Sequence, residues 1–201
     1  MGAEAEPRAA PFIWASWLAR VMSGRVSCEW QYWFQTHHRL RSKQPSSFDA
    51  LGWQIGHTRL LSEVRREASA RDIRPQIEFS ISFELPEVDA KIAGKADCLI
   101  VDGSDVTVLD CKTGNVHQSD QVQVMIYMYG LATYPQFARS RIRGQVIYRD
   151  ERVEIPYLPE HFEADLIYFA RALATGERPL RQPGPDCSFC SIAAIDCPER
   201  V

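Results

Sequence analysis

The strongest constraint on the fold is a change of hydrophobic period in the middle of the chain. Residues 77–83 alternate apolar and polar side chains, with one face formed by Ile77, Phe79, Ile81 and Phe83. A period of two is typical of a half-buried strand. Residues 91–101 and 105–112 follow as two further strands, and the Asp102-Gly103 dipeptide between them is a strong hairpin signal. The sequence therefore predicts an antiparallel hairpin at its centre.

Apolar residues at helical spacing lie on both sides of these strands. Residues 12–38 predict two short helices, broken at Ser23-Gly24, and residues 48–71 predict a long amphipathic helix. We expect the apolar side of the long helix to contain Leu51, Ile55, Leu60, Leu61 and Val64.

The second half of the chain repeats the mixture of helices and strands. Helices are predicted over residues 119–133 and 159–175, and a second hairpin over residues 144–149 and 152–158. Strands and helices thus alternate along the chain, and the predicted fold class is α/β (α+β).

Length and composition suggest one domain. The chain has 201 residues, 45% of them hydrophobic and 24% charged, which is ordinary for a globular protein. We expect a flexible arm over residues 1–12 and a single domain over residues 13–201. Within it the sequence separates a helical segment (13–47), a core (48–178) and an irregular tail (179–201). No stretch reaches the roughly 20 apolar residues of a membrane span, so no membrane contact is predicted.

Acidic and basic side chains gather at one end of the central hairpin. Asp110 and Lys112 point to the same face of their strand, because side chains alternate. A turn near Gly103 places Asp97 opposite Asp110, within a residue or two. Such a group alone is usually a surface ion pair. His57 lies on the long helix, where a lone histidine is usually a core residue.

The order of these motifs resembles a known family. Gly56-His57 and Gly94-x-x-Asp97 come first, followed by Asp110-x-Lys112-Thr-Gly and then Gln123-x-x-x-Tyr127. This order, over residues 52–131, resembles the RecB-like branch of the PD-(D/E)xK nuclease superfamily. Many relatives have Glu where this chain has Asp110. The resemblance implies a restriction-endonuclease-like core, with a central mixed sheet flanked by helices.

The resemblance also implies roles for the site residues. Mg²⁺ or Mn²⁺ is expected to be held by His57, Asp97, Asp110 and the backbone carbonyl of Cys111, because these ions prefer hard ligands. Lys112 is expected to orient or help deprotonate the attacking water. Gln123 and Tyr127 are expected to position the DNA strand or the lysine.

Six cysteines need a separate explanation. The N-terminus lacks the basic start of a secretory signal, so the expected location is the cytoplasm, where structural disulfides are rare. Clustered cysteines then favour metal binding. The tail holds Cys187, Cys190 and Cys197 in a Cys-x2-Cys-x6-Cys pattern, and the best fourth candidate is Cys28. We expect Cys98 and Cys111 to be small buried residues that face away from the carboxylates.

Two kinds of metal centre compete for the four cysteines. Structural zinc usually draws its ligands as two pairs, whereas one distant cysteine plus a triplet resembles the 4Fe–4S pattern of RecB-like nucleases. Unliganded thiols are the simplest alternative. In that family, the cluster clasps the two chain ends together.

The size of the chain resembles one group in particular, the CRISPR-associated Cas-four exonucleases, over residues 26–198. This resemblance implies a metal-dependent DNA exonuclease that trims single-stranded ends for CRISPR spacer acquisition, with the integrase complex as partner. Alternatives are an end-processing nuclease of a recombination, repair or phage system, a zinc-stabilised endonuclease, and a non-catalytic DNA-binding scaffold. The sequence leaves the oligomeric state open.

The charge of the chain does not exclude DNA. The formal net charge is −3, but 19 of the 23 basic residues are arginines. The guanidinium group matches phosphate in two-point hydrogen bonding. The candidate DNA contacts are Arg65, Arg66, Arg141 and Arg143, with a solvated helix face as the simpler interpretation of the first two.

Overall fold

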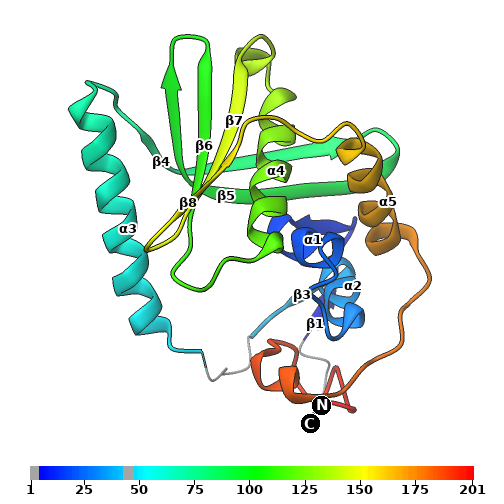
Figure 1. Cartoon of the computed structure of the whole chain (residues 1–201). Helices are drawn as coiled ribbons and strands as arrows, with labels where there is room; N and C mark the ends of the chain where they lie inside the picture. Colours follow the sequence, from blue (N-terminus) through cyan, green and yellow to red (C-terminus); the bar gives the residue numbers. More distant parts are fainter. Residues whose placement is uncertain (1–4, 43–47) are drawn as a thin grey trace.

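The computed structural model describes residues 5–42 and 48–201, and Figure 1 shows its elements. Residues 43–47 of the predicted helical segment and residues 1–4 of the predicted arm therefore lie outside the described part. The elements in chain order are β1 (Ala5–Pro7), β2 (Phe12–Trp14), α1 (Ala15–Met22), α2 (Glu29–His37), β3 (His38–Leu40), α3 (Ala50–Ala70), β4 (Gln76–Leu85), β5 (Val88–Asp102), β6 (Asp105–Cys111), α4 (Gln118–Ala132), η1 (Pro135–Phe137), β7 (Arg141–Ile147), β8 (Arg152–Ile155), α5 (Phe162–Thr175) and η2 (Pro185–Phe189).

The central sheet is mixed and has six strands. The long strand β5 pairs antiparallel with β4 and with β6, and parallel with β2. Strand β6 then pairs parallel with β7, which forms the second predicted hairpin with β8. The first hairpin turns at Gly103, whose φ of +61° lies in the left-handed region that glycine adopts without strain. Both predicted hairpins are confirmed.

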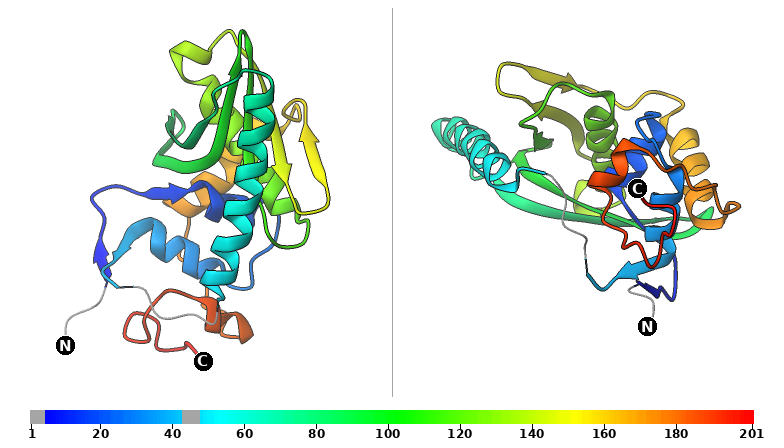
Figure 2. Two further views of the ribbon diagram at one scale, coloured as in Figure 1. Left: turned by 90° about the vertical axis from the view of Figure 1, so that its left-hand side faces the viewer. Right: turned by 90° about the horizontal axis from the view of Figure 1, so that it is seen from below.

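Helices cover both faces of the sheet, so the predicted class of a mixed sheet flanked by helices is confirmed. Helices α1, α4 and α5 pack on one face and bury the main core, which includes Leu18, Ile92, Ile126 and Leu166. Helix α3 lies on the other face, as Figures 1 and 2 show. The alternation of apolar residues in β6 explains this arrangement, because Val106 and Val108 face the main core while Leu109 and Cys111 face α3.

Only the second half of α3 packs as predicted. Leu60 and Val64 are buried in a small cluster with Cys98, Leu109 and Cys111, and Leu61 packs against it. The expectation for Leu51 and Ile55 is wrong, because these side chains are 69% and 65% exposed. Helix α3 extends beyond the sheet at this end (Figure 1), so in residues 5–42 and 48–201 no helix or strand covers its first turns.

The start of the chain is more ordered than predicted. Residues 5–7, expected to belong to a flexible arm, form strand β1, which pairs antiparallel with β3. Their partner strand follows α2, and the buried side chain of Ala5 packs with Trp30 and Phe34 of that helix. The C-terminal tail also returns to this region, where Ile192 completes the same apolar cluster. Within the described residues, no helix is both long and apolar enough to cross a membrane.

Candidate active site

The site forms at a gap in the pairing of β5. Along one edge, β5 pairs with β2 at residues 91–93 and with β6 at residues 98–102. Between these two stretches, residues 94–97 pair with no strand of the described residues on that edge. The ladder with β4 also omits the step at Asp97, where Glu78 adopts a left-handed φ of +55°. The backbone around Asp97 is therefore free to receive side chains from other elements.

Asp97 is held by two elements at once. Its Oδ2 accepts a hydrogen bond from the backbone N–H of Cys111 at 2.7 Å and lies 2.9 Å from Nε2 of His57. The β5–β6 ladder ends with Cys98 opposite Leu109, so Asp97 and Asp110 each follow directly after its last pair. Residue His57 comes from α3, where Trp53 stacks on its ring at a centroid distance of 4.9 Å.

Asp110 and Lys112 form a buried ion pair. The side chain of Asp110 is only 4% exposed, and its Oδ2 lies 2.7 Å from Lys112 Nζ. Burial raises the pKa of Asp110 to about 6, the nearby Asp97 charge adds to the rise, and Lys112 opposes it. Burial lowers the pKa of Lys112, but the charge and hydrogen bond of Asp110, together with the charges of Asp120 and Asp97, outweigh that effect and leave the pKa raised. This pair places an ammonium group beside two carboxylates at the edge of the core.

Gln123 and Tyr127 connect this pair to the gap. Gln123 Oε1 accepts from Lys112 Nζ at 3.2 Å, while its Nε2 donates to Asp110 Oδ1 at 3.3 Å and to the Tyr127 hydroxyl at 2.7 Å. The Tyr127 hydroxyl donates to the carbonyl of Lys95, in the unpaired stretch, at 3.2 Å. Burial raises the pKa of Tyr127, so it remains a neutral donor. The four-residue spacing on α4 thus supplies a continuous network.

Glycine is required where this network approaches the strand. A Cβ on Gly94 would lie 2.5 Å from Cε1 of Tyr127 and 3.1 Å from the methyl group of Ala15. No side chain fits at such distances without displacing the tyrosine. Gly94 in the Gly94-x-x-Asp97 motif therefore makes room for Tyr127.

Two residues near the site, Asp120 and Tyr148, were not predicted from the sequence. Asp120 lies on the same face of α4 as Gln123 and Tyr127, and its charge contributes to the raised pKa values of Asp110 and Lys112. Tyr148, just beyond β7, donates a hydrogen bond of 3.0 Å to Asp120. The three- and four-residue steps from Asp120 to Gln123 and Tyr127 were a signal that could have identified the acid.

The donor set fits a divalent cation. Asp97, Asp110 and His57 supply hard oxygen and nitrogen ligands at one buried edge. In the part of the chain that the structure describes, the buried Oδ2 of Asp110 has no hydrogen bond of good geometry, although Lys112 Nζ lies 2.7 Å from it. Among the described residues, no three His, Cys, Asp or Glu side chains already stand at metal-ligand spacing. Instead, His57 contacts Asp97 and Lys112 contacts Asp110 directly.

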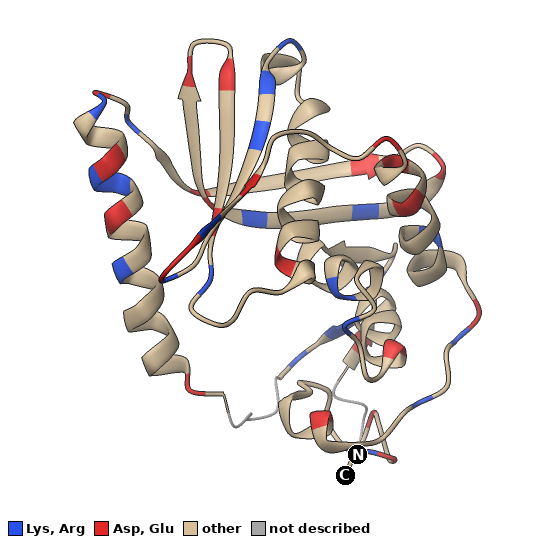
Figure 3. Cartoon of the chain, viewed as in Figure 1, with Lys and Arg blue, Asp and Glu red and all other residues tan. Residues whose placement is uncertain are grey.

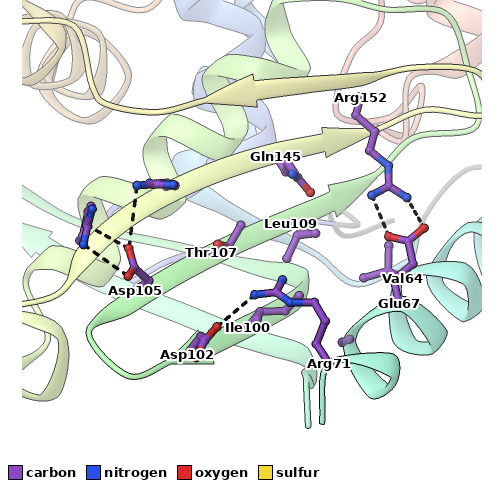
Figure 4. A pocket seen from close by; sticks show the side chains of 13 residues that line it. Val64, Glu67, Arg71, Ile100, Asp102, Asp105, Thr107, Leu109, Gln145 and Arg152 are labelled. Carbon is purple, nitrogen blue, oxygen red and sulfur yellow. Dashed lines mark hydrogen bonds and ion pairs between the residues drawn. The ribbon is translucent and has the colours of Figure 1, made fainter. Parts of the chain in front are cut away.

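The candidate DNA-binding arginines lie elsewhere. Arg141 and Arg143 extend from β7 and pair with Asp105 at 3.0 and 4.0 Å. They line a cavity of about 410 Å³ between the second half of α3 and the sheet, on the face opposite α4 (Figure 4). Arg65 and Arg66 are exposed on α3, where basic and acidic residues alternate (Figure 3). The structure does not bring these four arginines to the carboxylates.

The four predicted metal-binding cysteines gather at one place. Cys28, Cys187, Cys190 and Cys197 all line a cavity of about 30 Å³ beside Trp30, between α2 and the tail. That volume holds a water or two, so the cysteines as arranged do not enclose a cluster. Cys98 and Cys111 are buried in the small apolar cluster under α3, as predicted.

Comparisons with known proteins agree with this geometry. A family model described as the PD-(D/E)XK nuclease superfamily matches residues 15–198. Among solved structures, 25 chains match. One is the crystal structure of SSO0001, with a TM-score of 0.53 and 17% sequence identity, covering 92% of this chain and 85% of that one. At that identity the likeness shows the fold alone. No curated protein matches the chain. Because the family match covers helices α1 to α5 and nearly the whole central sheet, the chain belongs to the PD-(D/E)XK nuclease superfamily.

Proposed function

We propose that the chain is a metal-dependent deoxyribonuclease that hydrolyses single-stranded DNA from its ends. The observation that carries the proposal is the buried Asp110–Lys112 pair beside Asp97 and His57, at an unpaired stretch of β5. Nucleases of this superfamily use divalent ions such as Mg²⁺ or Mn²⁺. The preference for single-stranded ends rests on the resemblance to the Cas-four exonucleases.

The site residues would have three different roles in hydrolysis: binding the cation, orienting the water and positioning the lysine. Asp97, Asp110, His57 and the Cys111 carbonyl would hold the cation, which when bound neutralises phosphate charge and lowers the pKa of water. Lys112 has three N–H donors, of which Asp110 and Gln123 engage two. The third is available to orient a water or to stabilise charge on the phosphate. Gln123 and Tyr127 fix the direction of the lysine.

The experiment compares linear and circular DNA. End-labelled single-stranded DNA should be degraded with Mg²⁺ or Mn²⁺, a closed single-stranded circle should survive, and Asp110→Ala and Lys112→Ala should abolish activity. Asp89→Ala and Lys91→Ala are matched controls, because both residues are exposed at the far end of β5. Equal digestion of the circle would contradict the exonuclease assignment. Full activity in both site variants would place the chemistry elsewhere.

We also propose that the four gathered cysteines bind a 4Fe–4S cluster. The support is their spacing and their shared position around one cavity; the cavity must open by rearrangement of the tail to accept it. Anaerobically purified protein should show a broad absorbance shoulder near ~400 nm and iron that is lost in Cys197→Ala. A colourless preparation that contains zinc would favour the alternative metal, and one without metal would favour unliganded thiols.

The proposed biological setting is the processing of DNA ends. In the Cas-four resemblance, the nuclease trims DNA fragments for insertion by the CRISPR integrase complex. An end-processing enzyme of recombination, repair or phage replication would have the same site. A scaffold without catalysis would bind DNA and leave it uncut, and the buried pair of Asp110 and Lys112 argues against it, because burying charges without a use is costly.

A further inference from the structure

The first turns of α3 carry an unusual amount of exposed apolar surface. Leu51 and Ile55 are the most exposed, and just before them Phe48 is 53% exposed, while Trp53 is 43% exposed. Single exposed apolar residues are common, but a contiguous group of large ones usually marks a contact surface. We call the exposed ring of Trp53, together with the neighbouring Phe48, the aromatic platform.

The aromatic platform is directly connected to the candidate metal site. One side of the Trp53 ring stacks on His57 at 4.9 Å with an angle of 24° between the planes. His57 in turn lies 2.9 Å from the Asp97 carboxylate. The Phe48 ring is tilted by 54° to the Trp53 indole, and the two ring centroids are 6.3 Å apart. A flat group placed on this platform would therefore be one side chain away from the cation-binding residues.

A polar groove borders the same half of α3. It has a volume of about 440 Å³, and its lining includes Gly56, Arg59 and Glu63 of the helix and Thr113, Arg149 and Asp150 from the segments after β6 and β7, so basic and acidic side chains both border it. A Cβ on Gly56 would lie 3.0 Å from the Thr113 methyl group, so the helix approaches the strand that carries Asp110 and Lys112 closely. In the described part of the chain, Arg149 is exposed and has no ion pair, while Arg59 has only a 3.5 Å contact within the helix.

We propose that a single-stranded segment of the DNA substrate binds here, with one base stacked on Trp53 and its phosphates facing Arg59 and Arg149. This inference rests on the proposed nuclease function and adds the residues that select the substrate. Aromatic rings beside basic groups are the usual way to hold single strands, because every base has a flat face. In a duplex each base already stacks on its neighbours, so this platform favours unpaired ends.

The test measures binding without catalysis. In EDTA, fluorescence anisotropy of a labelled single-stranded oligonucleotide should show a Kd that rises on the order of 10-fold in Trp53→Ala. Trp53→Phe should keep most of the affinity, because a flat ring remains. Tyr168→Ala is the matched control, since Tyr168 is 67% exposed on a different helix, α5. Because EDTA removes divalent ions, weaker binding cannot arise from a disturbed metal site.

A set of oligonucleotides with a single abasic position locates the stacked base. Wild-type protein should lose affinity at one position, and Trp53→Ala should be insensitive to an abasic residue at that position. If the wild type digests DNA but neither Trp53→Ala nor an abasic position changes DNA affinity, the platform proposal is wrong and the proposed nuclease function stands. If Trp53→Ala weakens DNA binding but the wild type digests no DNA, the proposed nuclease function is wrong and the platform stands. A dimer in ultracentrifugation that Leu51→Ser dissociates, with unchanged DNA affinity, would assign this surface to a second copy of the chain and overturn the proposal.

Discussion

Lys112 places its ammonium group 2.7 Å from a carboxylate oxygen of Asp110 that is shielded from solvent. Within the described residues, that oxygen has no hydrogen bond of good geometry, so the ion pair with Lys112 is what offsets the cost of burying its charge. The stability of this end of the hairpin should therefore depend on keeping both charges or removing both.

We expect Lys112→Met to destabilise the metal-free protein by about 3–5 kcal/mol, because it leaves a buried carboxylate without its partner. The double variant Asp110→Asn/Lys112→Met should recover most of that loss. Urea denaturation of the wild type, both single variants and the double variant gives the coupling energy. Additive losses would mean that the pair does not act as a unit.

The contact between Gly94 and Tyr127 gives a second prediction. Gly94→Ala should displace the Tyr127 ring, disturb Gln123 and lower both stability and nuclease activity, with a stability loss of about 1–3 kcal/mol. In a Tyr127→Ala background the same substitution should cost much less, because the clash at 2.5 Å is gone. Thermal denaturation of the four proteins measures this difference. The control is Gly114→Ala, where no atom lies within 4 Å of the added Cβ.

Local patterns predicted the carboxylate arrangement because a hairpin leaves little freedom. The alternation of side chains puts Asp110 and Lys112 on one face, and the two-residue turn after Asp102 brings Asp97 within a residue or two of Asp110, next to the last ladder pair of Cys98 with Leu109. The helix spacing of Gln123 and Tyr127 likewise places both on one side of α4. These relationships depend on neighbours in sequence, which is why the sequence alone was sufficient.

Relationships between distant segments were not predictable in this way. The parallel pairing of β2 with β5 covers three residues and has no local signal, so the gap that admits Tyr127 was not foreseen. The pattern of α3 identified its apolar residues correctly, but a pattern does not reveal where the covering sheet ends. For this reason Leu51 and Ile55 were predicted to be buried and are exposed.

Arg152 and Glu67 form two hydrogen bonds of 2.6 and 2.7 Å that join α3 to β8 across the cavity in Figure 4. Both side chains are nearly half exposed, so a double-mutant cycle with Glu67→Gln and Arg152→Gln should give a coupling of only about 0.5–1 kcal/mol. The hydrogen bond from Arg152 lowers the pKa of Glu67 below 4.5.

Because the pKa of this acid is lower in the folded state, the coupling should be present at neutral pH and decline as the pH falls below 4.5. Urea denaturation at several pH values checks the sign. The comparison pair is Arg71–Asp102, which also joins α3 to the sheet but through one contact of 3.0 Å. An Arg152–Glu67 coupling that increased in acid would contradict the role assigned to the Glu67 charge.

The thiols of the metal-free protein should differ in reactivity in a defined order. Hydrogen bonds from the backbone near Val201 and Gly184 lower the pKa of Cys187, whereas burial raises the pKa values of Cys190 and Cys197. Burial also raises the pKa values of Cys98 and Cys111 to about 12.

The thiolate is the reactive form, so brief iodoacetamide treatment should modify Cys187 before the other two tail cysteines. Its rate should rise with pH through a midpoint below 9, the ordinary pKa of a cysteine, while Cys98 and Cys111 remain unmodified until the protein unfolds. Peptide mass spectrometry after timed labelling measures this order, and early labelling of Cys98 would show that α3 opens readily from the sheet.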